Sequence, residues 1–425
     1  MADINGTPGD NGLVGTSGDD TINAYAGNDV VIALDGSDTI YGDDGHDLLN
    51  GEQGNDTVYG GTGDDLIRPG TGDDYADGGS GYDRVSYASV GTDNLSAGVT
   101  VSLALQGTWQ DTGGGGVDYL VGFEHLTGTR FDDTLVGDNN DNWLWGGFDP
   151  ETGIAGNDAI SGSGGNDLIQ IGLGNATVDG GTGTDTLSFL GDDIGAPTGV
   201  SFDLSLQGAT QATSFGNVDA ANFENLSGTI FDDHLSGDDS ANILAGDRGD
   251  DHLSGGTGDD ALYGDGEINV ETHNLGYSGP INLIGDLFAG IRSTDPSVRP
   301  GNDVLNGGRG DDFLFGGGGD DVMTGGQGHD HFVIEWLSDR DTITDFSNQD
   351  TIIFDVRSAR AFSDLTFVDL GTDTLVSWGT PDSLLLEGVK PNQLSASDFS
   401  FGGAVPAALL PQHHSSPHSA DHFLI

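Results

Sequence analysis

Apolar residues recur at every ninth position over residues 6–86, with glycine and polar residues between them. This stretch divides into nine consecutive units without an insertion. One apolar residue per unit predicts a short strand that points that side chain inward, and stacked units would bury a continuous core that no unit could bury alone. The apolar residues, at the eighth place of each unit, are Leu13, Ile22, Val31, Ile40, Leu49, Val58, Ile67, Ala76 and Val85.

Glycine and aspartate also hold fixed places in the unit. The sixth place is aspartate in every unit but the first, which has Asn11. Glycine allows a backbone bend with positive φ that other residues resist. An aspartate at the bend offers a hard oxygen to a hard cation, with main-chain carbonyls as further ligands, so the pattern predicts calcium-binding loops. The fourth places are Gly9, Gly18, Gly27, Gly36, Gly45, Gly54, Gly63, Gly72 and Gly81.

Units such as GGTGDDLIR (60–68) resemble the RTX (repeats-in-toxin) family, whose nonapeptide forms a calcium-binding β-helix. The resemblance implies an all-β fold, a right-handed parallel β-roll/β-helix solenoid with two units per coil and calcium between loops two repeats apart. Asp20 would then face Asp38, and so on to Asp65 with Asp83. Units 24–32 and 33–41 lack glycine at their first two places, so we expect weak calcium binding there. The predicted metal ligands are Asp20, Asp29, Asp38, Asp47, Asp56, Asp65, Asp74, Asp83, Asp133, Asp158, Asp167, Asp185, Asp233, Asp251, Asp260, Asp303, Asp312, Asp321 and Asp330.

The repeats return in two further arrays, separated by two interruptions that resemble each other. Residues 98–107 (GVTVSLALQG) alternate apolar and polar side chains as a strand does. Phe131 and Phe231 lie in matching contexts, which indicates an internal duplication. The predicted parts are a first RTX array (1–86), a wider β-helix rung (87–127), a second array (128–188), a second wider rung (189–227), a third array (228–333) with an insertion (266–300), a C-terminal β cap (334–403) and a tail (404–425).

The insertion and the C-terminal part carry patterns of their own. Apolar residues between Ile281 and Ile291 stand near helical spacing, which predicts a short helix packed on the roll or a docking element for a partner. The region from 334 onwards resembles the segment after the repeats of serralysin-type metalloproteases. That resemblance implies a cap that protects the open strand edge, followed by an uncleaved type I secretion signal. Four histidines of the tail, between His413 and His422, fit a solvated tail better than a zinc or nickel site.

The charge changes what the repeats imply. The formal net charge is −59, and all but 8 of the 70 acidic residues are aspartate. We expect a random coil without calcium, because self-repulsion opposes compaction, and therefore expect metal binding and folding to be one event. The same charge argues against nucleic acid or an anionic membrane as partner. The absence of cysteine is compatible with export, and no apolar stretch is long enough to span a membrane.

Catalytic motifs are missing from the sequence. It contains no HExxH zinc helix, no G-x-S-x-G elbow and no Walker loop, so we predict that the chain is not an enzyme. Trp109, Trp143 and Trp145 lie in or after the first interruption. We expect them to fill the wider rung, since tryptophan is largely buried on average; the alternative is that they are exposed and stack on sugars.

These observations predict a secreted calcium-binding RTX protein with a structural role, as a surface-layer, filament or matrix subunit of a Gram-negative bacterium. Its expected partners are calcium ions, the type I secretion apparatus, and either a second copy of itself or a cell-surface glycan. Two alternatives remain open. One is a lyase or epimerase acting on acidic polysaccharide, which would need basic residues beside the acids. The other is a calcium-dependent carbohydrate-binding module.

Overall fold

The computed structural model describes residues 2–88, 95–147, 155–189, 198–265, 268, 301–334, 339–354, 359–378 and 382–401. Every regular element in these ranges is a β-strand except for five single-turn 3-10 helices, which confirms the all-β prediction. These short helices are η1 (Leu103–Leu105), η2 (Leu204–Leu206), η3 (Phe362–Asp364), η4 (Pro391–Gln393) and η5 (Ala396–Asp398). No helix in the described residues is long and apolar enough to cross a membrane.

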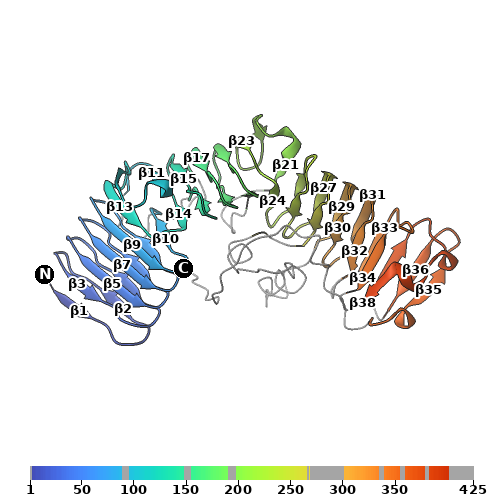
Figure 1. Cartoon of the computed structure of the whole chain (residues 1–425), viewed down its shortest axis with the longest axis horizontal. Coiled ribbons are helices and arrows are strands. Elements are labelled where there is room, and N and C mark those ends of the chain that lie inside the picture. Colours follow the sequence, from blue (N-terminus) through green and yellow to red (C-terminus); the bar gives the residue numbers. More distant parts are fainter. Residues whose placement is uncertain are drawn as a thin grey trace. The chain divides into compact units, whose positions relative to one another are not determined.

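The chain divides into two compact units, the first built mainly from Met1–Leu187 and Gly208–Phe223, the second mainly from Pro197–Gln207 and Glu224–Ile425. In the first unit, alternate strands of the chain stack into different sheets (Figure 1). Sheet A runs β1 (Asp3–Asn5), β3 (Thr21–Asn23), β5 (Thr39–Asp44), β7 (Thr57–Thr62), β9 (Tyr75–Ser80), β13 (Val117–Val121) and β12 (Trp109–Asp111). Sheet C runs β2 (Gly12–Val14), β4 (Val30–Ile32), β6 (Leu48–Asn50), β8 (Leu66–Arg68), β10 (Arg84–Ser86), β14 (His125–Thr127), β16 (Trp143–Trp145), β18 (Leu168–Gln170) and β20 (Thr186–Ser188). Sheet F runs β11 (Thr100–Ser102), β15 (Thr134–Val136), β17 (Asp158–Ser161), β19 (Ala176–Asp179), β23 (Asn217–Ala221) and β22 (Gln211–Ala212).

The nine-residue period becomes an eighteen-residue register in the first unit. Ile22 pairs with Ile40, and Ile40 with Val58, so each strand lies on the strand two units later in the chain. These side chains are fully buried, whereas their neighbours on the same strands are half-buried. Two nine-residue units therefore make one coil, and the eighth-place residues form the core between sheets A and C.

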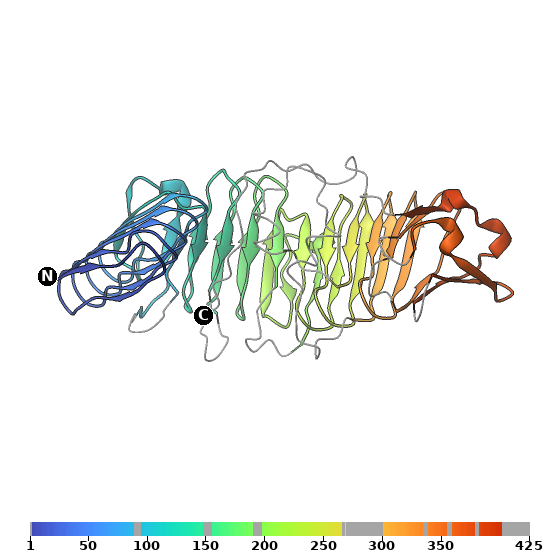
Figure 2. The same cartoon turned by 90° about the horizontal axis from the view of Figure 1, so that it is seen from below.

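The second unit repeats this architecture, and Figure 2 shows its yellow and orange strands as parallel rows. One sheet runs β21 (Ser201–Asp203), β25 (His234–Ser236), β27 (His252–Thr257), β29 (Val304–Arg309), β31 (Val322–Gln327), β33 (Arg340–Ile343), β37 (Ser383–Leu386), β36 (Thr374–Ser377) and β35 (Thr366–Asp369). The facing strands are β24 (Asn225–Ser227), β26 (Ile243–Ala245), β28 (Ala261–Tyr263), β30 (Phe313–Phe315), β32 (His331–Ile334), β34 (Thr351–Phe354) and β38 (Phe399–Phe401).

The first interruption continues the coils and adds a hairpin. β13 pairs in parallel with β9, and β14 pairs in parallel with β10. β12 pairs with β13 in the antiparallel sense and forms the edge of sheet A. The prediction that Trp109 fills the rung is wrong: it lies on this edge strand and is 57 % exposed. Trp143 and Trp145 are half-buried on β16.

In the C-terminal part, parallel pairing continues past residue 334. β33 pairs with β31, and β34 pairs with β32. β35, β36 and β37 then form an antiparallel meander at the end of their sheet. The predicted helix of the insertion and the histidine-containing tail lie outside the described residues.

Candidate metal centre

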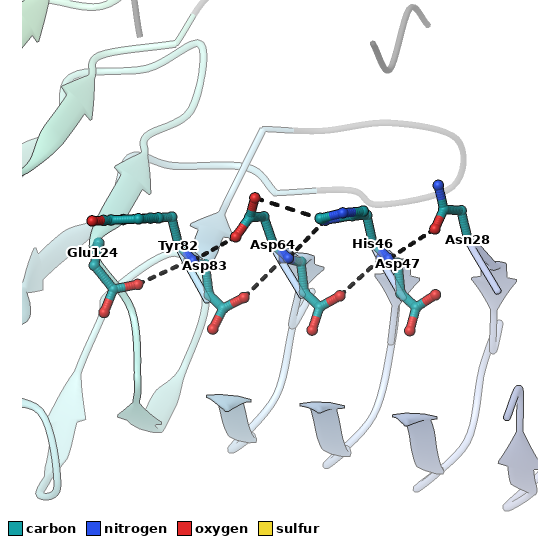
Figure 3. Close-up of polar contacts among 8 residues, drawn as sticks. Asn28, His46, Asp47, Asp64, Tyr82, Asp83 and Glu124 are labelled. Carbon is teal, nitrogen blue, oxygen red and sulfur yellow. Dashed lines mark hydrogen bonds and ion pairs between the residues drawn. The ribbon is translucent and has the colours of Figure 1, made fainter. Parts of the chain in front are cut away.

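The predicted ligands form rows in which each aspartate is held by the coil before it. Asp29 N–H donates to Asp47 Oδ1, Asp47 N–H to Asp65 Oδ1, and Asp65 N–H to Asp83 Oδ1, each at 2.8 Å. Figure 3 shows the part of this row that contains Asp47 and Asp83. All the predicted ligands are buried, and the Oδ1 of each accepts a main-chain N–H in this way. The pairs expected from the resemblance, Asp20 with Asp38 through Asp65 with Asp83, are therefore direct neighbours.

A second, more exposed row runs beside this one along the fifth places of the units. In Figure 3, His46 N–H donates to Asn28 Oδ1 at 3.1 Å, and Tyr82 N–H donates to Asp64 Oδ1 at 2.8 Å. Between them, Asp64 N–H donates to His46 Nδ1 at 2.8 Å. The fifth-place side chains thus satisfy further loop N–H groups, and the second oxygen of each sixth-place carboxylate is left for another role.

The second carboxylate oxygen distinguishes the buried row. In most regular coils Oδ2 is buried and accepts no hydrogen bond. A buried carboxylate oxygen without a donor costs free energy unless a cation balances it. The residues with such an oxygen include Asp29, Asp38, Asp47, Asp65, Asp74, Asp83, Asp167, Asp251, Asp260, Asp303, Asp312 and Asp321.

The space beside these oxygens is lined by main-chain carbonyls. A Cβ built on Gly60 would lie against both Asp65 Oδ2 and the Gly78 carbonyl oxygen. Calcium binds oxygen ligands at about 2.3–2.6 Å, carboxylates and carbonyls alike. Within the described ranges, no three side chains of His, Cys, Asp or Glu converge on one point. The donor set that fits calcium is therefore one carboxylate per loop together with carbonyl oxygens.

The loop shape persists in the units that lack glycine at the second place. Tyr25 and Leu34 both adopt φ of 74° there, and Asp43 and Glu52 adopt similar values. These conformations are strained for residues other than glycine. Asp29 and Asp38, in the irregular units, still have an Oδ2 without a donor, so the expected weakening of these loops would come from strain and not from a missing ligand.

Burial opposes the charge of these carboxylates in the absence of metal. Burial raises the pKa of Asp65 to about 8 and that of Asp74 to about 9, and neighbouring carboxylates add to the shift. In the second unit burial raises the pKa of Asp251 and of Asp303 to about 9. A bound cation would favour the ionised form and remove this penalty.

Three predicted ligands differ, because protein donors occupy both of their oxygens. Thr129 N–H donates to Asp133 Oδ2 at 2.6 Å, and the Thr129 hydroxyl contacts both carboxylate oxygens. Thr229 holds Asp233 through a main-chain and a hydroxyl bond in the same way. Burial raises the pKa of each aspartate only to about 6, since these donors favour the charge. Thr16 bonds Asp20 likewise.

These threonine-bonded aspartates stand near the start of the three arrays, and in each array the neighbouring unit has an asparagine at its sixth place. The Oδ1 of Asn142 accepts Asp138 N–H at 2.7 Å, and the Oδ1 of Asn242 accepts Asp238 N–H at 2.8 Å. Asn11 accepts Thr7 N–H at 3.0 Å in the first array. In the first units of each array, protein groups thus donate to the sixth-place side chains.

The row also includes acids that the repeat pattern did not identify. Asp74 N–H donates to Asp118 Oδ1, and Asp83 N–H donates to Glu124 Oε2. In the second unit, Asp321 N–H donates to Asp341 and Asp330 N–H to Asp350. Each of the four acids stands two residues before a buried apolar side chain. An acid two residues before an apolar residue is the spacing of the sixth and eighth places of the repeat unit. This spacing is the sequence signal that could have identified them.

Comparison with known proteins supports the same assignment. The family model described as RTX calcium-binding nonapeptide repeat (4 copies) matches more than half of the chain, at residues 5–40, 32–67, 51–85, 121–149, 152–187, 223–253, 236–270 and 299–332. No curated protein gave a significant match. Among solved structures, the extracellular lipase LipA from Serratia marcescens matches with 16 % identity over 64 % of this chain and 40 % of its own length, with a TM-score of 0.20. The matched part is thus about two fifths of that lipase. On the family match, the chain belongs to the RTX family of calcium-binding nonapeptide repeat proteins.

Proposed function

We propose that this chain is an exported structural protein that folds when it binds calcium outside the cell. The observation that carries the proposal is the run of buried Oδ2 atoms without donors in both units. In the metal-free fold burial opposes the ionisation of these carboxylates, and a bound cation would remove that penalty.

The location follows from calcium concentration. Extracellular calcium modules work at about 10⁻⁴ to 10⁻³ M. Scarce calcium inside the cell would leave the chain, with its net charge of −59, extended and suited to type I export. Abundant calcium outside would then fold it, because metal binding and folding are linked.

Circular dichroism of the full chain tests the folding part of the proposal. We expect coil in EDTA and cooperative appearance of β-structure at millimolar calcium. Magnesium at the same concentration serves as the control, since it demands near-ideal octahedral geometry and dehydrates reluctantly. Full β-structure in EDTA would contradict the proposal.

The share of the described residues that the repeats occupy supports a scaffold role and not catalysis. Repeats and the following strands occupy nearly all of the described residues, and leave no room among them for a catalytic domain of about 100 residues. Electron microscopy with calcium should show oligomers or fibres, and deletion of 266–300 should reduce them if that insertion mediates assembly. Uniform monomers, or release of products from alginate or pectin, would contradict this role.

A further inference from the structure

Five aromatic rings form a continuous row on the outer face of sheet A. Tyr41 stacks on Tyr59 with ring centroids 5.2 Å apart, and Tyr59 meets Tyr75 at 5.5 Å across the next strand. Tyr75 stacks on Tyr119 at 5.2 Å, and Trp109 closes the row at 5.5 Å from Tyr119. The row crosses β5, β7, β9, β13 and β12, one ring per strand.

The rings of this row offer two kinds of surface to solvent. Tyr41 with Tyr59, and Tyr75 with Tyr119, lie nearly parallel, so their faces cover each other, and each of the four tyrosines is half-buried. The plane of Trp109 is turned by 64° from that of Tyr119, so the indole does not continue the stack, and it is 57 % exposed. The row is therefore a polar-edged strip that ends in an accessible indole.

The second interruption shows that the backbone does not require these rings. Its hairpin β22–β23 has the register of β12–β13, with Gln211 paired to Val218 where Gln110 pairs to Asp118. The turn is kept as well: Gly208 N–H donates to the Ala220 carbonyl, as Gly107 N–H donates to that of Leu120, both at 2.8 Å. By this register, Thr210 and Asp219 stand where the first hairpin has Trp109 and Tyr119.

The same comparison covers the neighbouring strand. Thr177 pairs with Asp219 in β19 and β23, whereas Tyr75 pairs with Tyr119 in β9 and β13. The same backbone arrangement thus carries aromatic rings in the first interruption and small polar or acidic residues in the second. Because the exposed row is present in only one of these two matching hairpins, folding does not require it, and we interpret it as a surface with a ligand of its own.

Charge selects the class of ligand. None of the seven strands of sheet A contains Lys, Arg or His. Asp77 lies beside the row, and its carboxylate accepts a bond from the Tyr75 hydroxyl at 3.4 Å. The net charge of −59 would repel a polyanion. A neutral chain rich in hydroxyls would meet phenol hydroxyls, one exposed indole and the carboxylate of Asp77.

We propose that the row from Tyr41 to Trp109 binds an extended neutral polysaccharide. The hydroxyls of the polysaccharide would bond to the tyrosine hydroxyls and to Asp77, and one sugar ring would pack on the indole of Trp109. The proposal adds a ligand to the folded protein and does not depend on the scaffold role.

Affinity electrophoresis of the calcium-bound full chain tests the site. The gels would contain hydroxyethyl cellulose, glucomannan or alginate, and retardation would be measured against a gel without polymer. We expect retardation in at least one neutral polymer and none in alginate. The substitution W109T, which gives β12 the residue of the second hairpin, should weaken binding about tenfold, the effect of losing one aromatic contact.

Control variants separate binding from folding. Leu105 is 51 % exposed near the hairpin but lies outside the row, so L105A should bind as the unaltered chain does. Y59A should weaken binding, because Tyr59 joins the two stacked pairs, and circular dichroism with calcium should show that both variants and W109T fold normally. No retardation in either neutral polymer, equal retardation of W109T, or retardation in alginate alone would overturn the proposal.

Discussion

The regular coils at 6–86 and the first interruption at 87–127 complete one carboxylate row in different ways. In the coils, Asp74 has an Oδ2 that is buried and accepts nothing. In the interruption, the next member of the same row, Asp118, accepts the Tyr87 hydroxyl at 2.8 Å and the Thr112 hydroxyl at 3.0 Å on that oxygen. The backbone is continuous across the two, since β13 pairs with β9.

This difference indicates that calcium dependence is a local property of each loop. Where a hydroxyl reaches the second oxygen, the protein itself stabilises the charge; where glycine leaves the space open, a cation must do so. A single chain thus contains positions that need metal and positions that do not, in one hydrogen-bonded row.

Acidification without calcium should have the largest effect, because it acts on every coil together. Buried carboxyls with a raised pKa favour the metal-free fold fully below about pH 4, the value of an exposed aspartate, and that stability is lost as pH rises through their folded pKa values. Those values are about 8 for Asp65 and Asp83 and about 9 for Asp74. In EDTA, circular dichroism should show little β-structure at pH 9 and progressively more towards pH 5.

Two comparisons check the cause of this recovery. With saturating calcium, β-structure should change little between pH 6 and pH 9, because the bound metal keeps the carboxylates ionised. High salt at pH 9 screens exposed charges and not buried ones. If salt alone restored β-structure in EDTA, general repulsion and not the buried row would be responsible.

Filling one loop should have the next largest effect. The added methyl group of G60A would lie against both Asp65 Oδ2 and the Gly78 carbonyl, in the space that fits a cation. We expect the calcium concentration at the folding midpoint to rise by about tenfold or more. Gly12 is the control, since a Cβ there meets nothing within 4 Å, and equal midpoints for G60A and G12A would contradict the assignment of the site.

Substitution of single sixth-place aspartates should distinguish positions that need a cation from positions that protein donors satisfy. D65N keeps an oxygen for Asp47 N–H but loses the second carboxylate oxygen, so the chain should bind fewer calcium ions in isothermal titration calorimetry. In D133N the new amide would face Thr129 N–H, which now donates to Asp133 Oδ2. This variant should lose about 1–2 kcal/mol of stability and keep its calcium stoichiometry. Loss of the same number of ions from both variants would contradict the distinction.

The sequence predicted the coils well and the exceptions poorly, for physical reasons. The nine-residue period specifies strands, register and core, and Ile22, Ile40 and Val58 are buried as predicted. The period could not tell which loops need metal, because that depends on whether a hydroxyl reaches the second oxygen. Asp118 is held by Tyr87, 31 residues away in the chain, and no local pattern marks such a contact. Trp109 was misplaced because the antiparallel strand β12 interrupts the alternation that the coils follow.

Removing the Tyr87 hydroxyl should have the smallest effect on stability, and it tests most directly whether Asp118 is held by the protein or by a cation. Y87F keeps the buried ring of Tyr87 but removes the donor to Asp118 Oδ2, which still accepts the Thr112 hydroxyl. We expect a loss of about 1 kcal/mol, seen as a lower melting temperature at saturating calcium. The calcium midpoint should stay nearly unchanged, because the lost donor is part of the protein and not of a metal loop. A midpoint that rises as much as in D65N would mean that Asp118 is also a calcium ligand, and the distinction between metal-held and protein-held carboxylates would fail.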